Sequence, residues 1–274
     1  MIEIAPDIAA FQSFERDGWD RVAHLYDATW APLTTQLVEP LLDAGDVAAG
    51  QRVLDLACGP GYVAAAAARR GAAVVAIDLA PGMVEEARRR HRGLDVREGA
   101  AERVELSNAS CDRVLMNCGI LHVADPAAVL REVRRLLRTG GRFAFTVWAL
   151  PDVSPGARLV ESAIVAHALP ADDLPPGPDK YAYAEPARVR EALAAAGFAA
   201  SAVTLAVARW RVPDADYVFT AERTAGVRTA ALLALQEPAR LAAMAAALAA
   251  GMEEFRDGDG YALPMAAQVV VARR

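Results

Sequence analysis

Apolar residues recur along this chain in two patterns. Short apolar runs, most of them ending at a polar residue, lie near 53–57, 73–78, 94–98, 112–118 and 142–148. Between these runs, apolar residues recur every three or four positions, as they do on the buried face of a helix. Strands that alternate with helices predict a parallel sheet covered by helices. Two later runs, at 202–211 and 267–272, predict two further strands.

The regions outside these runs are helical or rich in proline. In residues 1–50, aromatic and aliphatic side chains recur at helical steps, which predicts helices that pack onto the sheet. Prolines mark loops around a short helix at about 156–168, and residues 214–255 are alanine- and leucine-rich. We therefore expect a single domain over 1–274. Its core is 51–150, and the insertions 151–185 and 212–257 form a helical cap without strands of their own.

Composition narrows the range of functions. The formal net charge of −6 and the pI near 5.3 argue against a general nucleic-acid binder, which would carry a basic face. The cysteines form no C-x-x-C pair, the first residues lack a signal-peptide pattern, and no apolar run approaches the ~18 residues of a membrane span. These features favour a cytoplasmic protein without membrane contact. No His/Cys/Asp cluster has metal-ligand spacing, and a homodimer is compatible with the sequence.

The most informative stretch is a strand that turns through Gly59-Pro60-Gly61 into a helix. The turn matches the G-x-G-x-x-A fingerprint of dinucleotide sites, but two residues argue against a diphosphate. Pro60 removes a backbone N–H donor, and Asp55 at the end of the strand would repel phosphate. A carboxylate at this position favours a ligand that carries an ammonium group.

Asp55-Leu-Ala-Cys-Gly-Pro-Gly61 resembles motif I of the class I S-adenosylmethionine (SAM)-dependent methyltransferases. The block from Asp112 to Trp148 resembles their ubiquinone- and menaquinone-biosynthesis-like branch, methyltransferase type 11, and the resemblance is specific over about 50–150. It implies an α/β, Rossmann-like fold that binds SAM. The expected sheet is seven-stranded and mixed, in the order 3-2-1-4-5-7-6, with helices on both faces.

The resemblance also implies which residues surround SAM. Asp78, at the end of the second strand, accepts bonds from the ribose hydroxyls, although a helix-capping role is the alternative. Ala100 replaces an adenine-binding aspartate of the family, and Ala57 replaces a glycine. The full set of expected cofactor-binding residues is Tyr26, Trp30, Asp55, Ala57, Gly59, Gly61, Asp78, Leu79, Met83, Ala100, Ala101, Glu102, Asn117 and Cys118.

Candidates for catalysis and acceptor binding lie farther along the chain. His122 follows the fourth strand, and histidine is the side chain type best suited to proton transfer near neutral pH, so His122 is the best candidate for a general base. A packed or capping histidine fits the sequence equally well. Trp148 and His167 are candidates for acceptor contacts. The apolar helices suggest a small, largely apolar acceptor, methylated on O, C or N, in secondary or quinone-type metabolism.

Two other functions stay open at this point. One is an NAD(P)-dependent oxidoreductase, which Asp55 and Pro60 disfavour. The other is a methyltransferase-fold protein that binds SAM but works as a cyclase or a sensor, and the missing carboxylate at Ala100 favours it.

Overall fold

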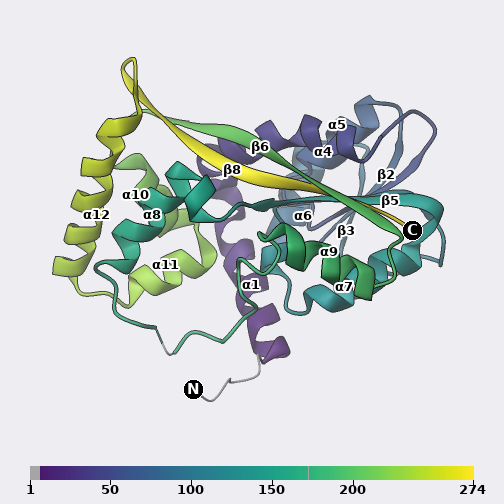
Figure 1. The fold of residues 1–274 in the computed structure, drawn as a ribbon, viewed down its shortest axis with the longest axis horizontal. Helices are drawn as coiled ribbons and strands as arrows, with labels where there is room; N and C mark the ends of the chain where they lie inside the picture. Colours follow the sequence, from purple (N-terminus) through teal and green to yellow (C-terminus); the bar gives the residue numbers. More distant parts are fainter. Residues whose placement is uncertain (1–6, 172) are drawn as a thin grey trace.

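The computed structural model describes residues 7–171 and 173–274 and contains one mixed sheet (Figure 1). The strands are β1 (Arg52–Leu56), β2 (Ala73–Asp78), β3 (Asp95–Glu98), β4 (Cys111–Asn117), β5 (Leu137–Trp148), β6 (Ala200–Val212), β7 (Arg256–Asp257) and β8 (Gly260–Arg273). Their order is β3-β2-β1-β4-β5-β8-β6, and β7 pairs only with β8. The predicted order 3-2-1-4-5-7-6 is confirmed, since the two-residue β7 only shifts the numbering of the last strand.

Helices cover both faces of the sheet. The core helices are α5 (Tyr62–Arg69), α6 (Pro81–Arg90), α7 (Pro126–Leu136) and α9 (Pro186–Ala195). One apolar cluster joins α5 and the N-terminal α4 (Val38–Ala44) to one face, while α7 and α9 pack into a separate cluster on the opposite face. Parallel strands need such crossover helices, and these bury the strands on both sides. The carboxyl ends of β1 to β5 therefore lie together at one edge.

The antiparallel strands β6 and β8 extend beyond the rest of the sheet. We call this pair the hairpin, although helices and β7 lie between the two strands in the sequence. Its ladder runs to the pair Val212–Tyr261, whereas β5 pairs with β8 only as far as Trp148–Ala267. The cap helices α8 (Pro155–Val165), α10 (Tyr217–Ala225), α11 (Val227–Ala234) and α12 (Pro238–Met252) surround this extension. Apolar side chains of the hairpin and of the cap helices share one cluster.

The strands of this region are longer than the sequence pattern predicts. Both hairpin strands are longer than the predicted 202–211 and 267–272, and the insertion 212–257 ends in the short strand β7. This two-residue strand pairs only with β8 of the main sheet, and the rest of the cap is helical. Beyond Trp148 only the two-residue β7 pairs with the hairpin in the described chain, and the helical cap buries the inner face of the hairpin. That burial depends on tertiary contacts, which the strand pattern alone does not show.

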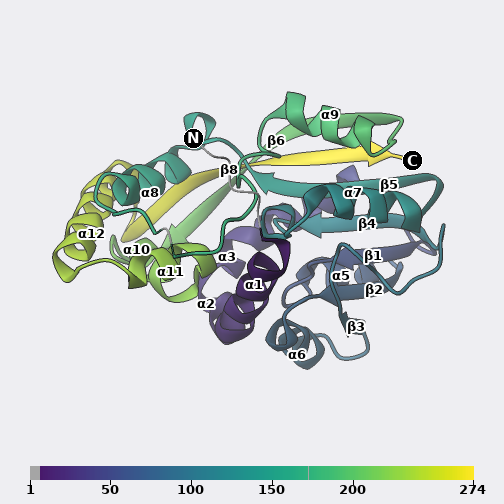
Figure 2. The same cartoon turned by 90° about the horizontal axis from the view of Figure 1, so that it is seen from below.

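The N-terminal segment lies between the cap and the sheet edge (Figure 2). It contains α1 (Ile8–Val22), α2 (Tyr26–Thr29), α3 (Ala31–Thr34) and α4, joined by the 3₁₀ turns η1 (Ala23–Leu25) and η2 (Thr35–Leu37). The first of these helices contacts α6 through Asp20, whose Oδ1 accepts the Gly82 N–H at 2.6 Å. Since the N-cap residue of α6, Ala80, provides no side-chain cap, α1 supplies the missing acceptor.

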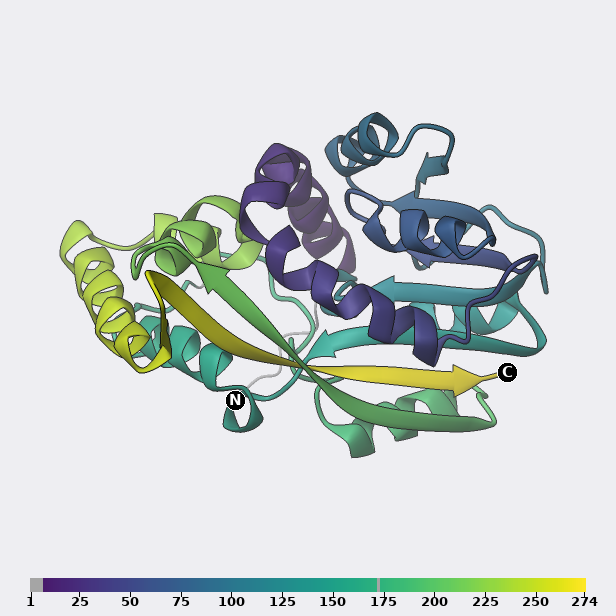
Figure 3. The ribbon, with the colours of Figure 1, turned by 90° about the horizontal axis from the view of Figure 1, so that it is seen from above.

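Seen from above, the N-terminal helices lie across the ends of the parallel strands (Figure 3). Three further 3₁₀ turns complete the fold: η3 (Ile120–His122), η4 (Pro151–Val153) and η5 (Glu253–Phe255). No helix within the described ranges is both long and apolar enough to cross a membrane.

Candidate functional site

A narrow pocket of about 30 Å³ lies at the carboxyl ends of β1 and β4, beneath residues 26–35. We call these residues the N-terminal cover. The pocket is lined by Tyr26, Thr34, Thr35, Asp55, Ala57, Cys58, Gly59, Pro60, Tyr62, Val63 and Asn117. The lining residues come from four separate segments, and five of them were predicted from the sequence. The crevice at the carboxyl ends of the strands is where open α/β sheets bind ligands.

The glycine turn has the backbone that its sequence predicts. Gly59 and Gly61 have φ angles of 51° and 83°, in the left-handed region. A side chain on Gly59 would meet no atom within 4 Å, so the turn is open on this side. Gly61 is the N-cap of α5. Ala57 also has a left-handed φ of 51°, which costs a non-glycine residue about 1–2 kcal/mol.

Asp55 is fully buried at the end of β1. Its Oδ2 accepts the Ala64 N–H at 2.9 Å, in the first turn of α5. Its Oδ1 is also buried and has no hydrogen-bond partner among the described residues. Burial raises the pKa of Asp55 to about 8. The hydrogen bond from Ala64 lowers this pKa, and the nearby Asp78 raises it further. Because an unpaired buried carboxylate oxygen is costly, this position fits a cationic partner.

Asp78 ends β2 and is held by two backbone N–H groups. Its Oδ2 accepts from Gly59 at 2.8 Å, and its Oδ1 accepts from Ala80 at 2.9 Å. Burial raises the pKa of Asp78, while these two bonds and the nearby His122 oppose the rise. Asp78 thus joins the glycine turn to the start of α6. Each of its oxygens still has acceptor capacity, so the ribose role stays a prediction.

Asn117 and Cys118 connect β4 to β5 and to the N-terminal cover. Asn117 Nδ2 donates to the Thr34 carbonyl at 3.1 Å, and its Oδ1 accepts from the Thr146 hydroxyl at 2.6 Å. The same hydroxyl accepts the Cys118 N–H at 2.8 Å. Burial raises the pKa of the Cys118 thiol to about 12. A thiol in this state is not a nucleophile at neutral pH.

Hydrogen bonds hold the N-terminal cover over the pocket. The Tyr26 hydroxyl lies 3.0 Å from Thr34 Oγ1, inside the cover. Asp27 accepts the hydroxyl of Tyr62 on α5 and forms an ion pair with Arg90 on α6. The cover is therefore fixed to the two helices that follow β1 and β2.

The predicted cofactor residue Trp30 does not line the pocket. Its ring stacks on Trp210 at a centroid distance of 5.0 Å, and its Nε1 donates to the Ala225 carbonyl at 3.0 Å. Trp30 therefore links the N-terminal cover to the cap.

The residues predicted on the adenine side do not line the narrow pocket. Met83 is buried beside Ala80 and packs against Trp19 and Tyr26. Leu79 and Ala100 are half-buried, and Ala101 belongs to the core. Glu102 accepts the Ala124 N–H at 3.1 Å, so this carboxylate holds the loop before α7. Roles for these residues toward adenine stay predictions.

His122 forms a cluster with two residues of α1 that the sequence analysis did not single out as functional. Its Nδ1 lies 3.0 Å from Oε2 of Glu15, and its ring meets Trp19 edge-on at a centroid distance of 4.9 Å. Trp19 Nε1 donates to the same Oε2 at 3.0 Å. The one signal in the sequence was a glutamate within an aromatic stripe, four residues before a tryptophan.

The two predicted acceptor residues lie in or near the cap. Trp148 is half-buried at the end of β5 and packs into the cluster that joins the hairpin to the cap. His167 follows α8, and its carbonyl accepts from Arg240 at 2.8 Å. Neither residue lines the pocket, and their acceptor roles stay predictions. No group of three His, Cys, Asp or Glu side chains suited to a metal ion occurs in the described part of the chain.

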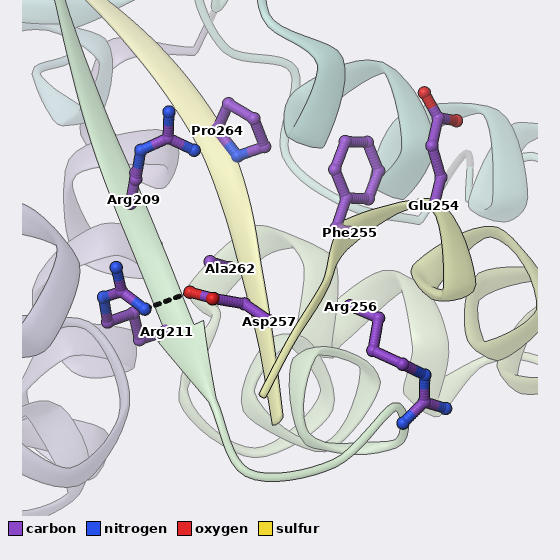
Figure 4. A pocket seen from close by; sticks show the side chains of 8 residues that line it. All are labelled: Arg209, Arg211, Glu254, Phe255, Arg256, Asp257, Ala262 and Pro264. Carbon is purple, nitrogen blue, oxygen red and sulfur yellow. Dashed lines mark hydrogen bonds and ion pairs between the residues drawn. The ribbon is translucent and has the colours of Figure 1, made fainter. Parts of the chain in front are cut away.

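A wider groove of about 420 Å³ lies on the hairpin extension (Figure 4). Two of its arginines already have partners, since Arg211 pairs with Asp257 and Arg256 pairs with Glu253 at 2.8 Å. The groove lies beyond the last pair between β5 and β8, away from the carboxyl ends of β1 and β2. We therefore place the candidate site at the narrower pocket.

Comparison with known proteins agrees with this geometry. A family model described as "Methyltransferase domain" matches residues 54–145. The demethylmenaquinone methyltransferase of Clavibacter sepedonicus is 36% identical over 149 residues, which cover 49% of this chain and 58% of that protein. The corresponding protein of Beutenbergia cavernae is 33% identical over 172 residues, which cover 61% of this chain and 72% of that protein. The chain thus spans little more than half the length of the first of these relatives.

Solved structures show the same fold. Phosphoethanolamine N-methyltransferase 2 of Haemonchus contortus, in complex with phosphomonomethylethanolamine and S-adenosylhomocysteine, superposes with a TM-score of 0.55 at 17% identity. The superposition covers 95% of this chain and 60% of that one. Given the fold, the glycine turn and the extent of the match to the Beutenbergia protein, this chain belongs to the class I SAM-dependent methyltransferases.

Proposed function

We propose that this chain binds SAM beneath the N-terminal cover and transfers its methyl group to a small acceptor. The observation that carries the proposal is Oδ1 of Asp55, which is buried at the pocket without a partner. The α-ammonium group of SAM is the cation that would donate a hydrogen bond to this oxygen. The pocket is also less suited to a diphosphate, because Pro60 has no N–H to donate and Asp55, once ionised, would repel anions. These features favour SAM over NAD(P).

Each side of the pocket offers one part of the binding site. Asp55 would hold the ammonium group, Asp78 the ribose hydroxyls, and the Tyr26 ring would lie over the sulfonium, which a ring face attracts. When bound, SAM supplies a methyl group on a positively charged sulfur. The chain's own contribution is to orient the acceptor and to exclude water, and the cover and the apolar cap supply the walls for this.

We propose a quinol or a related hydroxylated aromatic compound as the acceptor. The relatives are named for demethylmenaquinone, and the cap cluster of this chain contains Trp148, Trp210 and Phe219 beside aliphatic side chains. An aromatic hydroxyl is weakly acidic, so its reaction gains from a base. We propose His122 as this base, a role supported by its position beyond the end of β4 and near Asp78.

The cofactor assignment can be tested by isothermal calorimetry with SAM, S-adenosylhomocysteine and NADH. SAM and S-adenosylhomocysteine should bind to the wild-type protein, whereas NADH should not. Asp55→Asn should weaken both adenosyl ligands by about 10- to 100-fold, because a hydrogen bond to a charged group contributes about 1.5–3 kcal/mol. Tighter binding of NADH than of SAM would overturn the assignment.

The reaction can be tested by transfer of radiolabelled methyl from SAM to a series of 1,4-naphthohydroquinones. His122→Gln should lower kcat by about 10²–10⁴-fold if the imidazole is the base, and should leave the affinity for SAM nearly unchanged. A His122→Gln enzyme with the wild-type rate would remove His122 from this role.

A further inference from the structure

Glu15 is the feature of α1 that its surroundings explain least. Its side chain is 4% exposed, in a stripe of aromatic residues that packs α1 onto the fold. Burying a carboxylate is costly unless charged or polar partners compensate for it. An apolar residue would fill this position at a lower desolvation cost. We therefore attribute the presence of a carboxylate here to its two hydrogen bonds.

Those two bonds go to the same oxygen. Oε2 of Glu15 accepts from Trp19 Nε1 at 3.0 Å and lies 3.0 Å from Nδ1 of His122. The bond to Trp19 is a local one, four residues along the same helix. The bond to His122 joins residues 107 positions apart in the sequence. It connects α1 to the loop that follows β4.

We propose that Glu15 is a positioning residue for His122, an inference that rests on the proposed function. By accepting from Nδ1, the carboxylate fixes the neutral ring with its proton on Nδ1 and leaves the lone pair of Nε2 free. Nε2 then takes the proton of the acceptor hydroxyl, and the carboxylate stabilises the imidazolium that forms. A buried aspartate has this role toward histidine in serine proteases.

The groups around the ring agree with this role. The edge of the imidazole is held against Trp19, which limits its rotation. The charged groups that face it from neighbouring elements are the carboxylates of Glu15 on α1 and of Asp78 at the end of β2. Glu102, from the loop after β3, binds the backbone of Ala124, two residues beyond His122, and so supports the same loop.

The test uses three variants of the full chain. Glu15→Gln keeps the size of the side chain and removes the charge, and Glu15→Leu removes the acceptor as well. Asp20→Asn is the matched control, because Asp20 also fixes α1 to the fold but bonds Gly82 and not His122. The first readout is the ¹⁵N spectrum of the histidine rings at alkaline pH with S-adenosylhomocysteine present, and His122→Gln assigns the signals.

Wild type and Asp20→Asn should show His122 protonated on Nδ1, and Glu15→Leu should lose this preference. With an active naphthohydroquinone, Glu15→Gln should lower kcat at least about tenfold, with the KM for SAM within about twofold of wild type. An Nε2-protonated ring in the wild type, or an unchanged ring in Glu15→Leu, would overturn the proposal. So would a Glu15→Gln enzyme as fast as Asp20→Asn.

The spectra separate this proposal from the proposed function. If no acceptor is methylated but the ring follows Glu15 as expected, the contact with His122 stands and the assigned reaction fails. If methylation depends on His122 but the ring and the rate ignore Glu15, only the positioning role fails. A purely structural Glu15 would instead lower the melting temperature and weaken SAM binding without changing the ring.

Discussion

At the scale of single residues, the site depends on a carboxylate that the fold buries without satisfying both of its oxygens. The pKa of Asp55 is about 8 in the folded chain, against an ordinary value of 3.8. Folding therefore favours the protonated form. The resulting stability is fully present below about pH 4 and is lost as the pH rises through about 8.

The first prediction follows from this shift. Without ligand, the free energy of unfolding of the wild type should fall relative to Asp55→Asn between pH 5 and pH 9, by an amount on the order of a few kcal/mol. Urea titrations of both proteins across this range measure the difference. Parallel pH profiles would mean that Asp55 is ionised in the folded protein, with a partner other than a ligand.

Asp78 accepts hydrogen bonds from two backbone N–H groups and is proposed to bind the ribose, so one substitution would disturb both interactions. Asp78→Ala should weaken SAM by roughly 1.5–3 kcal/mol, as expected for bonds to a charged acceptor, and should also leave two backbone donors unpaired. Asp78→Asn should weaken it less. The matched control is Glu98→Ala, since Glu98 is the exposed register partner of Asp78 on β3. Calorimetry that finds equal affinities for Asp78→Ala and Glu98→Ala would disprove the ribose role.

At the scale of elements, the N-terminal cover is the part that must respond to a ligand, because the pocket beneath it is narrow. The bond from Tyr62 to Asp27 closes the cover onto α5. Tyr62→Phe should therefore speed the dissociation of SAM by about 2- to 10-fold, the equivalent of one ordinary hydrogen bond. Stopped-flow tryptophan fluorescence measures this rate. Tyr181→Phe, which loses a comparable bond to Glu161 in the cap region, should not change it.

Elements with a local signal could be predicted, and elements that depend on docking could not. Gly59, Gly61 and Asp55 belong to one strand–turn–helix unit, so their sequence was enough to place them together. Thr34 reaches the same pocket only because α3 lies across the sheet edge. Likewise, the stacking of Trp30 on Trp210 of β6 joins residues that are far apart in the sequence, so no local pattern reveals it.

At the scale of the whole molecule, the hairpin extension joins the cap to the core, because apolar side chains of both pack against it. Trp210 is 1% exposed between them, and its Nε1 has no partner in the described chain. Trp210→Ala should cost about 3–5 kcal/mol of stability. Trp210→Phe should cost less, because it keeps an aromatic ring in the core and the indole N–H that it removes has no partner in the described chain. Urea unfolding followed by circular dichroism checks both values, and equal losses would mean that the indole N–H does bond in solution.

The position of β8 has a consequence for the growing chain on the ribosome. This strand lies between β5 and β6 and pairs with both, yet it is synthesised after every other described element. Until it emerges, β5 is an exposed edge, β6 has no partner, and the cap helices lack the surface they cover. The parallel half of the sheet and its nucleotide-type turn can form early. The cap and the hairpin, where the acceptor is proposed to bind, can form only after β8 has emerged. Until then the nascent chain would present an open apolar strand edge that chaperones recognise.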